Sequence, residues 1–143
     1  MTEILVKKLN PKAILPTYAH TGDSGWDLYS CENVILPPNG RVLVSTGLAM
    51  AIPQGYEGCI RPRSGNALKF GYTVLNTPGT IDSNYRGEIK VILFNTTDNV
   101  ILIKEQDRIA QMVIQKLPII FLKEVNELDS TNRGSDGFGS TGK

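Results

Sequence analysis

Residues 72–95 read YTVLNTPGTIDSNYRGEIKVILFN, and this stretch decides the fold class. The run Val91-Ile92-Leu93-Phe94 is apolar on both faces of a β-strand, which predicts a strand buried on two sides, in part by another subunit. Residues 72–75 predict a second strand, and the polar segment between the two strands contains a Pro-Gly pair. The stretch therefore predicts a strand, a polar hairpin tip and a buried strand.

The rest of the chain repeats this pattern of short apolar runs between turn residues. Beyond 72–75 and 88–95, we expect strands at 4–9, 26–30, 41–52, 56–61, 100–103, 109–115 and 119–125. Such spacing is typical of an all-β sandwich or barrel. Only residues 64–70 predict a helix, which begins at Ser64 as N-cap, stops at Gly71 and is short enough to need tertiary support.

The composition restricts the classes of function. A length of 143 residues suits one domain, and 15 Lys and Arg against 14 Asp and Glu give a formal charge of +1. This balance argues against nucleic-acid and membrane partners, which attract strongly basic proteins. Two cysteines and one histidine are too few for a disulfide framework or for a zinc site within one chain, so we expect a reducing, cytoplasmic setting.

Two polar patches lie in the first half of the chain. Asp27 follows a glycine-rich turn at 22–25, where it could cap the turn or bind a ligand. Residues 61–66 place two arginines beside a predicted helix start with a serine and a glycine. Helix N–H groups and guanidinium charge can form an anion site, although a capped surface helix with solvated arginines fits the same residues.

Two further patches follow. The hairpin tip carries Asn76, Asp82 and Tyr85: the amide can read a base edge, the carboxylate can take a proton from water, and the ring can cover a sugar. A merely polar hairpin tip is the alternative. In residues 106–111, Asp107 and Arg108 predict a structural ion pair, and Gln111 could hydrogen-bond a ligand or a neighbouring strand.

The composition changes at about residue 126. We therefore divide the chain into a β-domain at 1–125 and a mobile C-terminal arm at 126–143. The simplest reading of the arm is a disordered end without a role. Phe138 argues against that reading, because an aromatic ring between two glycines suits stacking better than it suits a linker.

Taken together and in order, residues 22–28, 62–71, 76–88, 107–111 and 133–142 resemble the five motifs of the trimeric deoxyuridine triphosphatases (dUTPases). The most specific matches are Pro-Arg-Ser-Gly, Gly-Thr-Ile-Asp-Ser-Asn-Tyr-Arg-Gly-Glu and Gly-Phe-Gly-Ser-Thr-Gly. The resemblance implies a jelly-roll-like (β-clip) subunit, a homotrimer with active sites shared between subunits, and Mg²⁺-dependent hydrolysis of dUTP to dUMP and pyrophosphate. It also implies a role in limiting uracil in DNA and in supplying dUMP.

The resemblance implies roles for individual residues. Asp82 is expected to deprotonate the water that attacks the α-phosphorus, and Asp27 to contact Mg²⁺ through water. The residues expected to bind substrate come from the arginine patch at 61–66, the hairpin at 76–90, the patch at 106–111 and the arm. They are Arg63, Ser64, Gly65, Asn76, Gly79, Thr80, Ile81, Tyr85, Lys90, Gln111, Arg133, Phe138, Gly139, Ser140 and Thr141. Three residues depart from the family pattern, namely Trp26 for Tyr or Phe, Asn84 for Asp and Gln106 for Gly.

Two other functions remain open at this stage. A dCTP deaminase on a related scaffold needs a glutamate near the base to move protons, and the hairpin from Asn76 to Tyr85 contains none. A nucleotide-sensing module would bind without turnover, and a regulatory protein partner is possible if the chain is phage-encoded. Ammonia release, pyrophosphate release and binding alone distinguish the three.

Overall fold

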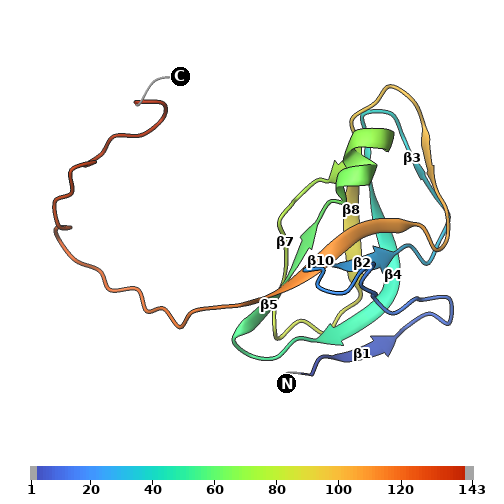
Figure 1. The fold of residues 1–143 in the computed structure, drawn as a ribbon, viewed down its shortest axis with the longest axis horizontal. Helices are drawn as coiled ribbons and strands as arrows, with labels where there is room; N and C mark the ends of the chain where they lie inside the picture. The colour runs from blue at the N-terminus through green and yellow to red at the C-terminus, as the bar shows by residue number, and fades with distance from the viewer. Residues whose placement is uncertain (1–2, 141–143) are drawn as a thin grey trace.

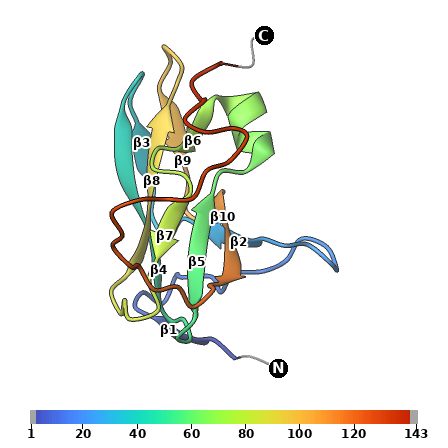
Figure 2. The same cartoon turned by 90° about the vertical axis from the view of Figure 1, so that its left-hand side faces the viewer.

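The computed structural model describes residues 3–140, which form ten strands and one short helix. One four-stranded sheet has the order β1-β4-β8-β6, and a second has the order β2-β10-β5-β7. A separate ribbon pairs β3 with β9 at one end of the molecule (Figures 1 and 2). The all-β prediction is confirmed.

The strand bounds agree with most of the expected positions. The first sheet contains β1 (Leu5–Lys8), β4 (Arg41–Ala51), β8 (Ile89–Asn95) and β6 (Tyr72–Val74). The second contains β2 (Trp26–Tyr29), β10 (Arg108–Lys116), β5 (Tyr56–Arg61) and β7 (Gly79–Ile81). The ribbon contains β3 (Val34–Leu36) and β9 (Ile101–Ile103). Sequence reasoning missed β3 and took β7 for part of the hairpin tip.

The hydrophobic core contains apolar side chains from both sheets. In β8, Ile89, Val91 and Leu93 are fully buried, whereas Ile92 and Phe94 on the other face are half-buried. The core side chains that are least exposed are Leu28, Leu36, Val44, Leu48, Ile89, Val91, Leu93, Ala110 and Met112. Within one chain, β8 is therefore fully covered on one face and partly covered on the other.

A β-bulge interrupts β4 opposite the start of β8. The register with β8 shifts between Ser45 and Leu48, and Gly47 adopts a φ of +68°. A Cβ atom at this position would lie 2.9 Å from the Cβ atoms of Ala13 and Asn10. Only glycine therefore suits both the backbone conformation and the space, and tightly packed neighbours hold the bulge in place.

The single helix, η1 (Asn66–Phe70), is a π-helix that follows β5. Gly71 ends it with a φ of 73°, as expected. Gly65 rather than Ser64 occupies the N-cap position, and no side chain caps the helix, so the N-cap prediction for Ser64 is wrong. The buried Asn66 donates from Nδ2 to the Arg108 carbonyl at 2.9 Å, which fixes the helix start against β10 and gives the short helix its tertiary support.

Residues 117–140 leave the two sheets as an extended segment, which includes the described part of the arm at 126–140 (Figure 1). The strand expected at 119–125 is wrong, because this segment has no strand partner in the single chain and its side chains are exposed. Ile119, Phe121 and Leu122 are each at least 88% exposed. A run of apolar side chains so open to water indicates a surface that another polypeptide covers.

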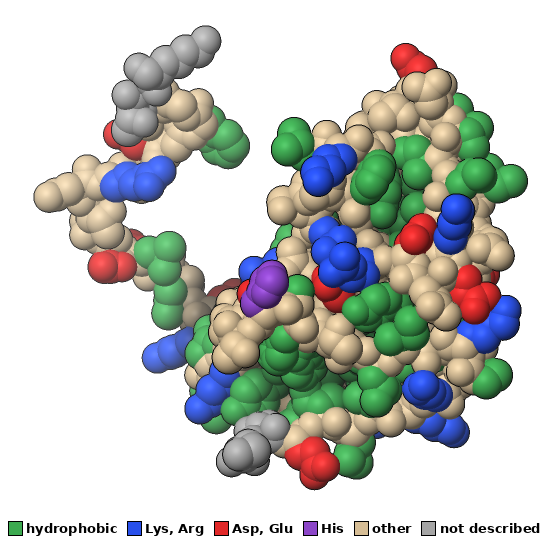
Figure 3. All heavy atoms as spheres, turned by 45° about the vertical axis from the view of Figure 1, so that its right-hand side comes forward, with side chains coloured by type: hydrophobic (Ala, Val, Ile, Leu, Met, Phe, Trp, Pro, Cys, Tyr) green, Lys and Arg blue, Asp and Glu red, His purple; other side chains and the backbone are tan. Residues whose placement is uncertain are grey.

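The surface carries both signs of charge. On the face shown in Figure 3, Lys and Arg side chains are interspersed with Asp and Glu. Within residues 3–140, no helix is long and apolar enough to cross a lipid bilayer.

Candidate active site

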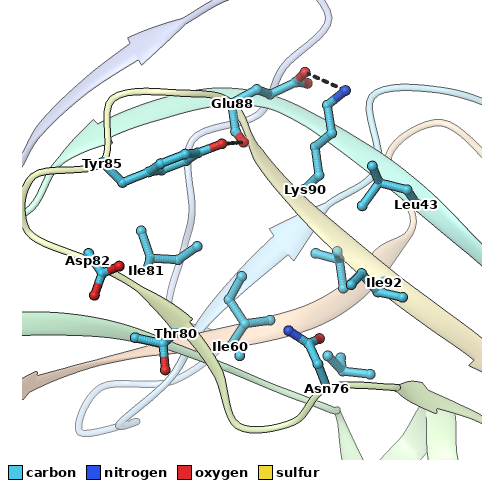
Figure 4. Close-up of a pocket in the computed structure, with 13 residues that line it drawn as sticks. Leu43, Ile60, Asn76, Thr80, Ile81, Asp82, Tyr85, Glu88, Lys90 and Ile92 are labelled. Carbon is cyan, nitrogen blue, oxygen red and sulfur yellow. Dashed lines mark hydrogen bonds and ion pairs between the residues drawn. The ribbon is translucent and has the colours of Figure 1, made fainter.

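The hairpin between β7 and β8 forms one wall of a cleft of about 560 Å³ (Figure 4). Sequence reasoning assigned Asn76, Gly79, Thr80, Ile81, Asp82, Tyr85 and Lys90 to the substrate site, and all seven line this cleft. Apolar side chains complete the wall: Leu43, Ile60, Val74, Val91 and Ile92. Glu88, which sequence reasoning did not assign to the site, also lines the cleft, which is therefore an apolar slot with an amide, two carboxylates, a phenol and an ammonium at its margin.

β7 is the edge strand of its sheet. It pairs only with β5, through Gly58 with Ile81 and Ile60 with Gly79. Its other edge therefore carries backbone N–H and C=O groups that β5 does not use. Gly79 is buried beside the Asn76 amide, and a Cβ at Gly79 would lie 3.3 Å from Asn76 Nδ2. The absence of a side chain there lets the amide lie close to the strand.

Asp82 lies immediately after β7, at the start of the turn that leads to Tyr85. Its backbone carbonyl accepts a hydrogen bond from the Tyr85 N–H at 3.1 Å, which closes the turn. The Asp82 side chain is exposed and lines the cleft. The four ion pairs found among residues 3–140 do not include it. This carboxylate is positioned by backbone structure and is accessible to a water molecule.

The Tyr85 ring folds back over the hairpin toward the first residue before β8. Its hydroxyl donates to the Glu88 carbonyl oxygen at 2.9 Å (Figure 4). A Cβ at Gly87 would lie 2.4 Å from that hydroxyl, so only glycine leaves room for the ring. Lys90 also faces the cleft, and its Nζ lies 3.4 Å from Glu88 Oε2.

A second, smaller pocket of about 270 Å³ contains the other predicted site residues outside the arm. Its wall unites three sequence patches: Ala19, Asp23, Ser24, Gly25, Asp27, Arg63, Ser64, Gly65 and Gln111. Asp27 and Gln111 face each other in the register of β2 with β10. Gln111 donates from Nε2 to the Pro62 carbonyl at 2.9 Å, which ties β10 to the arginine patch.

Asp27 is the electrostatic centre of this pocket. Its carboxylate, about 10% exposed, accepts from Arg63 Nε at 2.8 Å and from Arg108 at 3.4 Å. Because Asp27 contacts Arg63 through Nε, the two terminal nitrogens of that guanidinium, which make no hydrogen bond within the described part of the chain, can bind an anion. The pocket is therefore suited to phosphate.

The expected ion pair between Asp107 and Arg108 is wrong. The Asp107 carboxylate instead accepts from the Lys104 backbone N–H at 2.8 Å, which closes the loop before β10. Gln106 adopts a φ of 72° in that loop, a conformation that glycine tolerates better. Arg108 is thus a site residue that sequence reasoning missed. Strand alternation could not have found it, because positions 108 and 111 are three residues apart and the register of β10 with β2 shifts between Arg108 and Ala110.

A buried tyrosine lies behind the phosphate-type pocket. Tyr72, Arg63 and Arg108 line a neighbouring hollow, and Tyr72 is 5% exposed. Burial, and secondarily the charge of Asp107, raises the pKa of Tyr72 to about 12. The phenol is therefore neutral at physiological pH and acts as a packing group beside the two arginines.

The two pockets share no residue. The hairpin residues with Asp82 line one pocket, and the arginine patch with Asp27 lines the other. One chain therefore presents two separate sets of polar groups, one in each pocket.

The arm residues predicted to bind substrate lie apart from both pockets in this structure. Arg133 donates from Nε to the Asp136 carbonyl at 3.0 Å, so a local turn is present. Phe138 is fully exposed with a φ of 50°, and Gly139 follows with a φ of 88°. Ser140 closes the next turn by donating its N–H to the Gly137 carbonyl at 3.0 Å. Thr141 lies outside the described residues.

Comparison with known proteins agrees with this geometry. The dUTPase family model matches residues 11–142. The deoxyuridine 5'-triphosphate nucleotidohydrolase of Wolinella succinogenes is 57% identical over 141 residues, which cover 99% of this chain and 95% of that protein.

Solved structures give the same result. The dUTPase of Staphylococcus bacteriophage 80alpha with dUpNHpp superposes with a TM-score of 0.89 at 30% identity and covers 100% of both chains. That phage protein is described as controlling transfer of virulence genes. The D95N dUTPase of Staphylococcus aureus phage phi11, described with a structural Mg(II) ion, superposes with a TM-score of 0.81 at 28% identity, over 88% of this chain and 98% of that one. The family match over residues 11–142 and the 57% identity to the Wolinella succinogenes protein lead to one conclusion: this chain belongs to the dUTPase family.

Proposed function

We propose that this protein hydrolyses dUTP to dUMP and pyrophosphate. The proposal rests on the cleft at β7 and β8, where the outer edge of β7, the Tyr85 ring and the exposed Asp82 carboxylate lie side by side. We assign these three to the base, the sugar and the attacking water. The family's named relatives act on deoxyuridine triphosphate, and a related phage enzyme binds the analogue dUpNHpp. This reaction limits uracil in DNA and supplies dUMP for thymidylate synthesis.

The free edge of β7 recognises uracil. The base presents an N–H donor between two carbonyl acceptors, and a β-strand edge offers the complementary alternation of C=O and N–H groups. The backbone of Gly79, Thr80 and Ile81 supplies this edge, and the Asn76 amide adds a side-chain contact. Cytosine carries a different pattern, so it leaves buried polar groups unpaired at a cost of about 1–3 kcal/mol each.

Asp82 acts as the general base. Its carboxylate takes a proton from a water molecule as the water oxygen attacks the α-phosphorus. The bond from the α-phosphorus to the bridging oxygen breaks, and pyrophosphate leaves with the electron pair. The rigid turn between Asp82 and Tyr85 fixes the carboxylate relative to the sugar, because the Tyr85 ring lies under the deoxyribose in the same turn.

The phosphates bind to the second pocket of a neighbouring copy in a homotrimer. Arg63 presents its two free guanidinium nitrogens, and Ser64, Gly65 and Gln111 supply the shorter-range donors. Two findings support assembly. The two pockets share no residue, and the segment at 119–122, just before the arm, exposes a run of large apolar side chains. Arg108, which pairs with Asp27, adds positive charge at the pocket's rim.

The residues of the second pocket also suit Mg²⁺ that arrives with the triphosphate. Mg²⁺ prefers oxygen ligands, keeps several waters and often uses few carboxylates besides substrate phosphates. Asp27 offers a carboxylate whose oxygens each accept one arginine contact, which leaves lone pairs for a metal-bound water. When bound, the ion neutralises developing charge on the phosphates. The negative charge of Asp27 also keeps Arg63 oriented toward the same phosphates.

The arm completes the site. Phe138 stacks on the uracil, while Arg133, Gly139, Ser140 and Thr141 contact the terminal phosphates. The exposed ring and the positive-φ glycine that follows it give the arm freedom to adapt to bound substrate. Stacking of an aromatic ring on a base contributes about 1–3 kcal/mol. We place the protein in the cytoplasm, where its thiols Cys31 and Cys59, both free and buried, stay reduced.

Pyrophosphate release from dUTP, dTTP, dCTP and UTP, each with and without Mg²⁺, tests the proposed function. We expect release from dUTP with Mg²⁺ and far lower rates for the other three nucleotides. Ammonia release from dCTP would instead identify a deaminase. Tight binding of dUTP without turnover would identify a sensing module.

A further inference from the structure

Glu88 connects the cleft to the neighbouring strand through three contacts. Its backbone carbonyl accepts the Tyr85 hydroxyl at 2.9 Å, and its Oε2 lies 3.4 Å from Lys90 Nζ (Figure 4). Its Oε1 accepts the Gly47 backbone N–H at 2.9 Å. One residue at the foot of the hairpin therefore links the tyrosine ring to the bulge in β4.

The bulge is a rigid anchor. Gly47 is buried with a φ of +68°, and Ala13, Asn10 and Cys31 surround it. Because the register with β8 shifts between Ser45 and Leu48, Gly47 has no paired residue on β8. A carboxylate that accepts a backbone N–H forms a charge-assisted hydrogen bond, which is stronger than a neutral one. The Glu88 side chain is 23% exposed, so water competes only weakly for this bond.

The tyrosine ring, in contrast, is held by few contacts. Tyr85 is 43% exposed, its ring lies against Gly87, and within residues 3–140 its hydroxyl makes one hydrogen bond, to the Glu88 carbonyl. The position of the ring thus depends on the carbonyl of Glu88. The position of that carbonyl depends in turn on how firmly the Glu88 side chain is held at Gly47.

We propose that Glu88 is a positioning residue that determines the choice of deoxyribose over ribose, by fixing the Tyr85 ring to the β4 bulge. The inference rests on the proposed function, in which the ring lies under the sugar. A steric filter excludes a hydroxyl group only if its wall cannot move, so loosening the ring admits the 2′-hydroxyl of UTP. The acid at position 88 thereby acts on the substrate through Tyr85.

The chain offers a matched control for this contact. Glu32 Oε1 accepts the Ser45 backbone N–H at 2.7 Å, at the other side of the same bulge. Glu32 does not line the cleft. Glu32→Ala therefore removes a comparable carboxylate-to-amide bond from the same strand without touching the tyrosine.

The experiment measures kcat/KM for dUTP and for UTP, together with the thermal midpoint, in Glu88→Ala, Glu88→Gln, Glu32→Ala and the unmodified protein. In Glu88→Ala we expect the ratio of the two kcat/KM values to fall about tenfold, mainly through faster UTP hydrolysis. In Glu88→Gln the amide oxygen still accepts the Gly47 N–H, so the ratio is retained although Lys90 loses its partner. Glu32→Ala lowers the midpoint but keeps the ratio.

An unchanged ratio in folded Glu88→Ala overturns the proposal. An equal fall of the ratio in Glu32→Ala also overturns it, because it would show a general effect of bulge stability.

If Glu88→Ala does not fold, Glu88→Asp replaces it, because the aspartate carboxylate is one methylene too short to reach Gly47. Retained selectivity for dUTP in Glu88→Asp also overturns the proposal. A protein that hydrolyses no dUTP before any substitution refutes the proposed function itself. The two failures are thus distinguishable.

Discussion

Replacing Asp82 by asparagine separates the chemistry of the site from its fold. The substitution keeps the shape of the side chain but removes the group that can take a proton. Because Asp82 is exposed and takes part in none of the ion pairs among the described residues, we expect stability to change by less than about 0.5 kcal/mol. The backbone bond that closes the turn with Tyr85 is unaffected.

The loss in rate follows from the role of a general base. Such a group contributes about 10²- to 10⁴-fold, so kcat falls by that factor, which equals about 2.7–5.4 kcal/mol of barrier. KM for dUTP should not rise, because the change removes a negative charge beside an anionic substrate. A stopped or continuous pyrophosphate assay over a range of dUTP concentrations gives kcat and KM separately, and thermal unfolding gives stability.

Asp98→Asn is the matched control for this measurement. Asp98 lies on an exposed turn after β8, where its Oδ1 accepts from Asn39 Nδ2 at 2.8 Å, and an asparagine oxygen can still accept that bond. It should leave kcat unchanged. If Asp82→Asn keeps more than about a third of the original kcat, less than 1 kcal/mol of barrier is at stake and Asp82 is not the base.

Three further predictions concern the loop, the core and the arm. Gln106→Gly relieves the φ of 72° and should stabilise the protein by up to about 1 kcal/mol, seen as a higher urea midpoint at constant m-value; a lower midpoint contradicts it. The folded-state pKa of Tyr72 is raised to about 12, so the free energy of unfolding should fall as pH rises from about 10 toward 12. In Tyr72→Phe, the free energy of unfolding measured across that range should fall less; an identical fall in both proteins refutes the assignment. Ending the chain before Arg133 should preserve assembly in gel filtration but lower kcat/KM for dUTP by about 5- to 150-fold, which corresponds to about 1–3 kcal/mol of lost stacking; full activity would show that the arm has no role.

Most strands could be predicted because their side chains alternate or cluster in short apolar runs. β5 was predicted with its observed bounds, and β10 within one residue at each end. The short β3 was missed because two prolines, Pro37 and Pro38, follow it directly and disfavour a strand, whereas β6 and β9 of the same length were predicted. The strand expected at 119–125 has the right composition but no partner in the single chain, and a strand requires a partner for its backbone groups.

Sequence reasoning predicted which residues belong to the candidate site better than it predicted the contacts between them. The resemblance to the family placed Asn76, Asp82 and Tyr85 together, and the structure brings them to one cleft. It did not reveal that Arg108 pairs with Asp27, since neighbours in sequence suggested Asp107 as the partner. Successive residues of an extended chain face opposite sides, so Asp107 and Arg108 point apart and Arg108 finds its partner on another strand.

The separation of the two pockets has a consequence for inheritance. If copies share sites as proposed, a chain that lacks the hairpin carboxylate can supply its arginine pocket to a chain whose arginine pocket is damaged, and the site between them unites two intact halves. Two alleles that are each inactive alone can then complement one another in a cell that carries both. A chain damaged in both pockets, in contrast, spoils two sites in a mixed assembly, so the activity lost exceeds its share of the population.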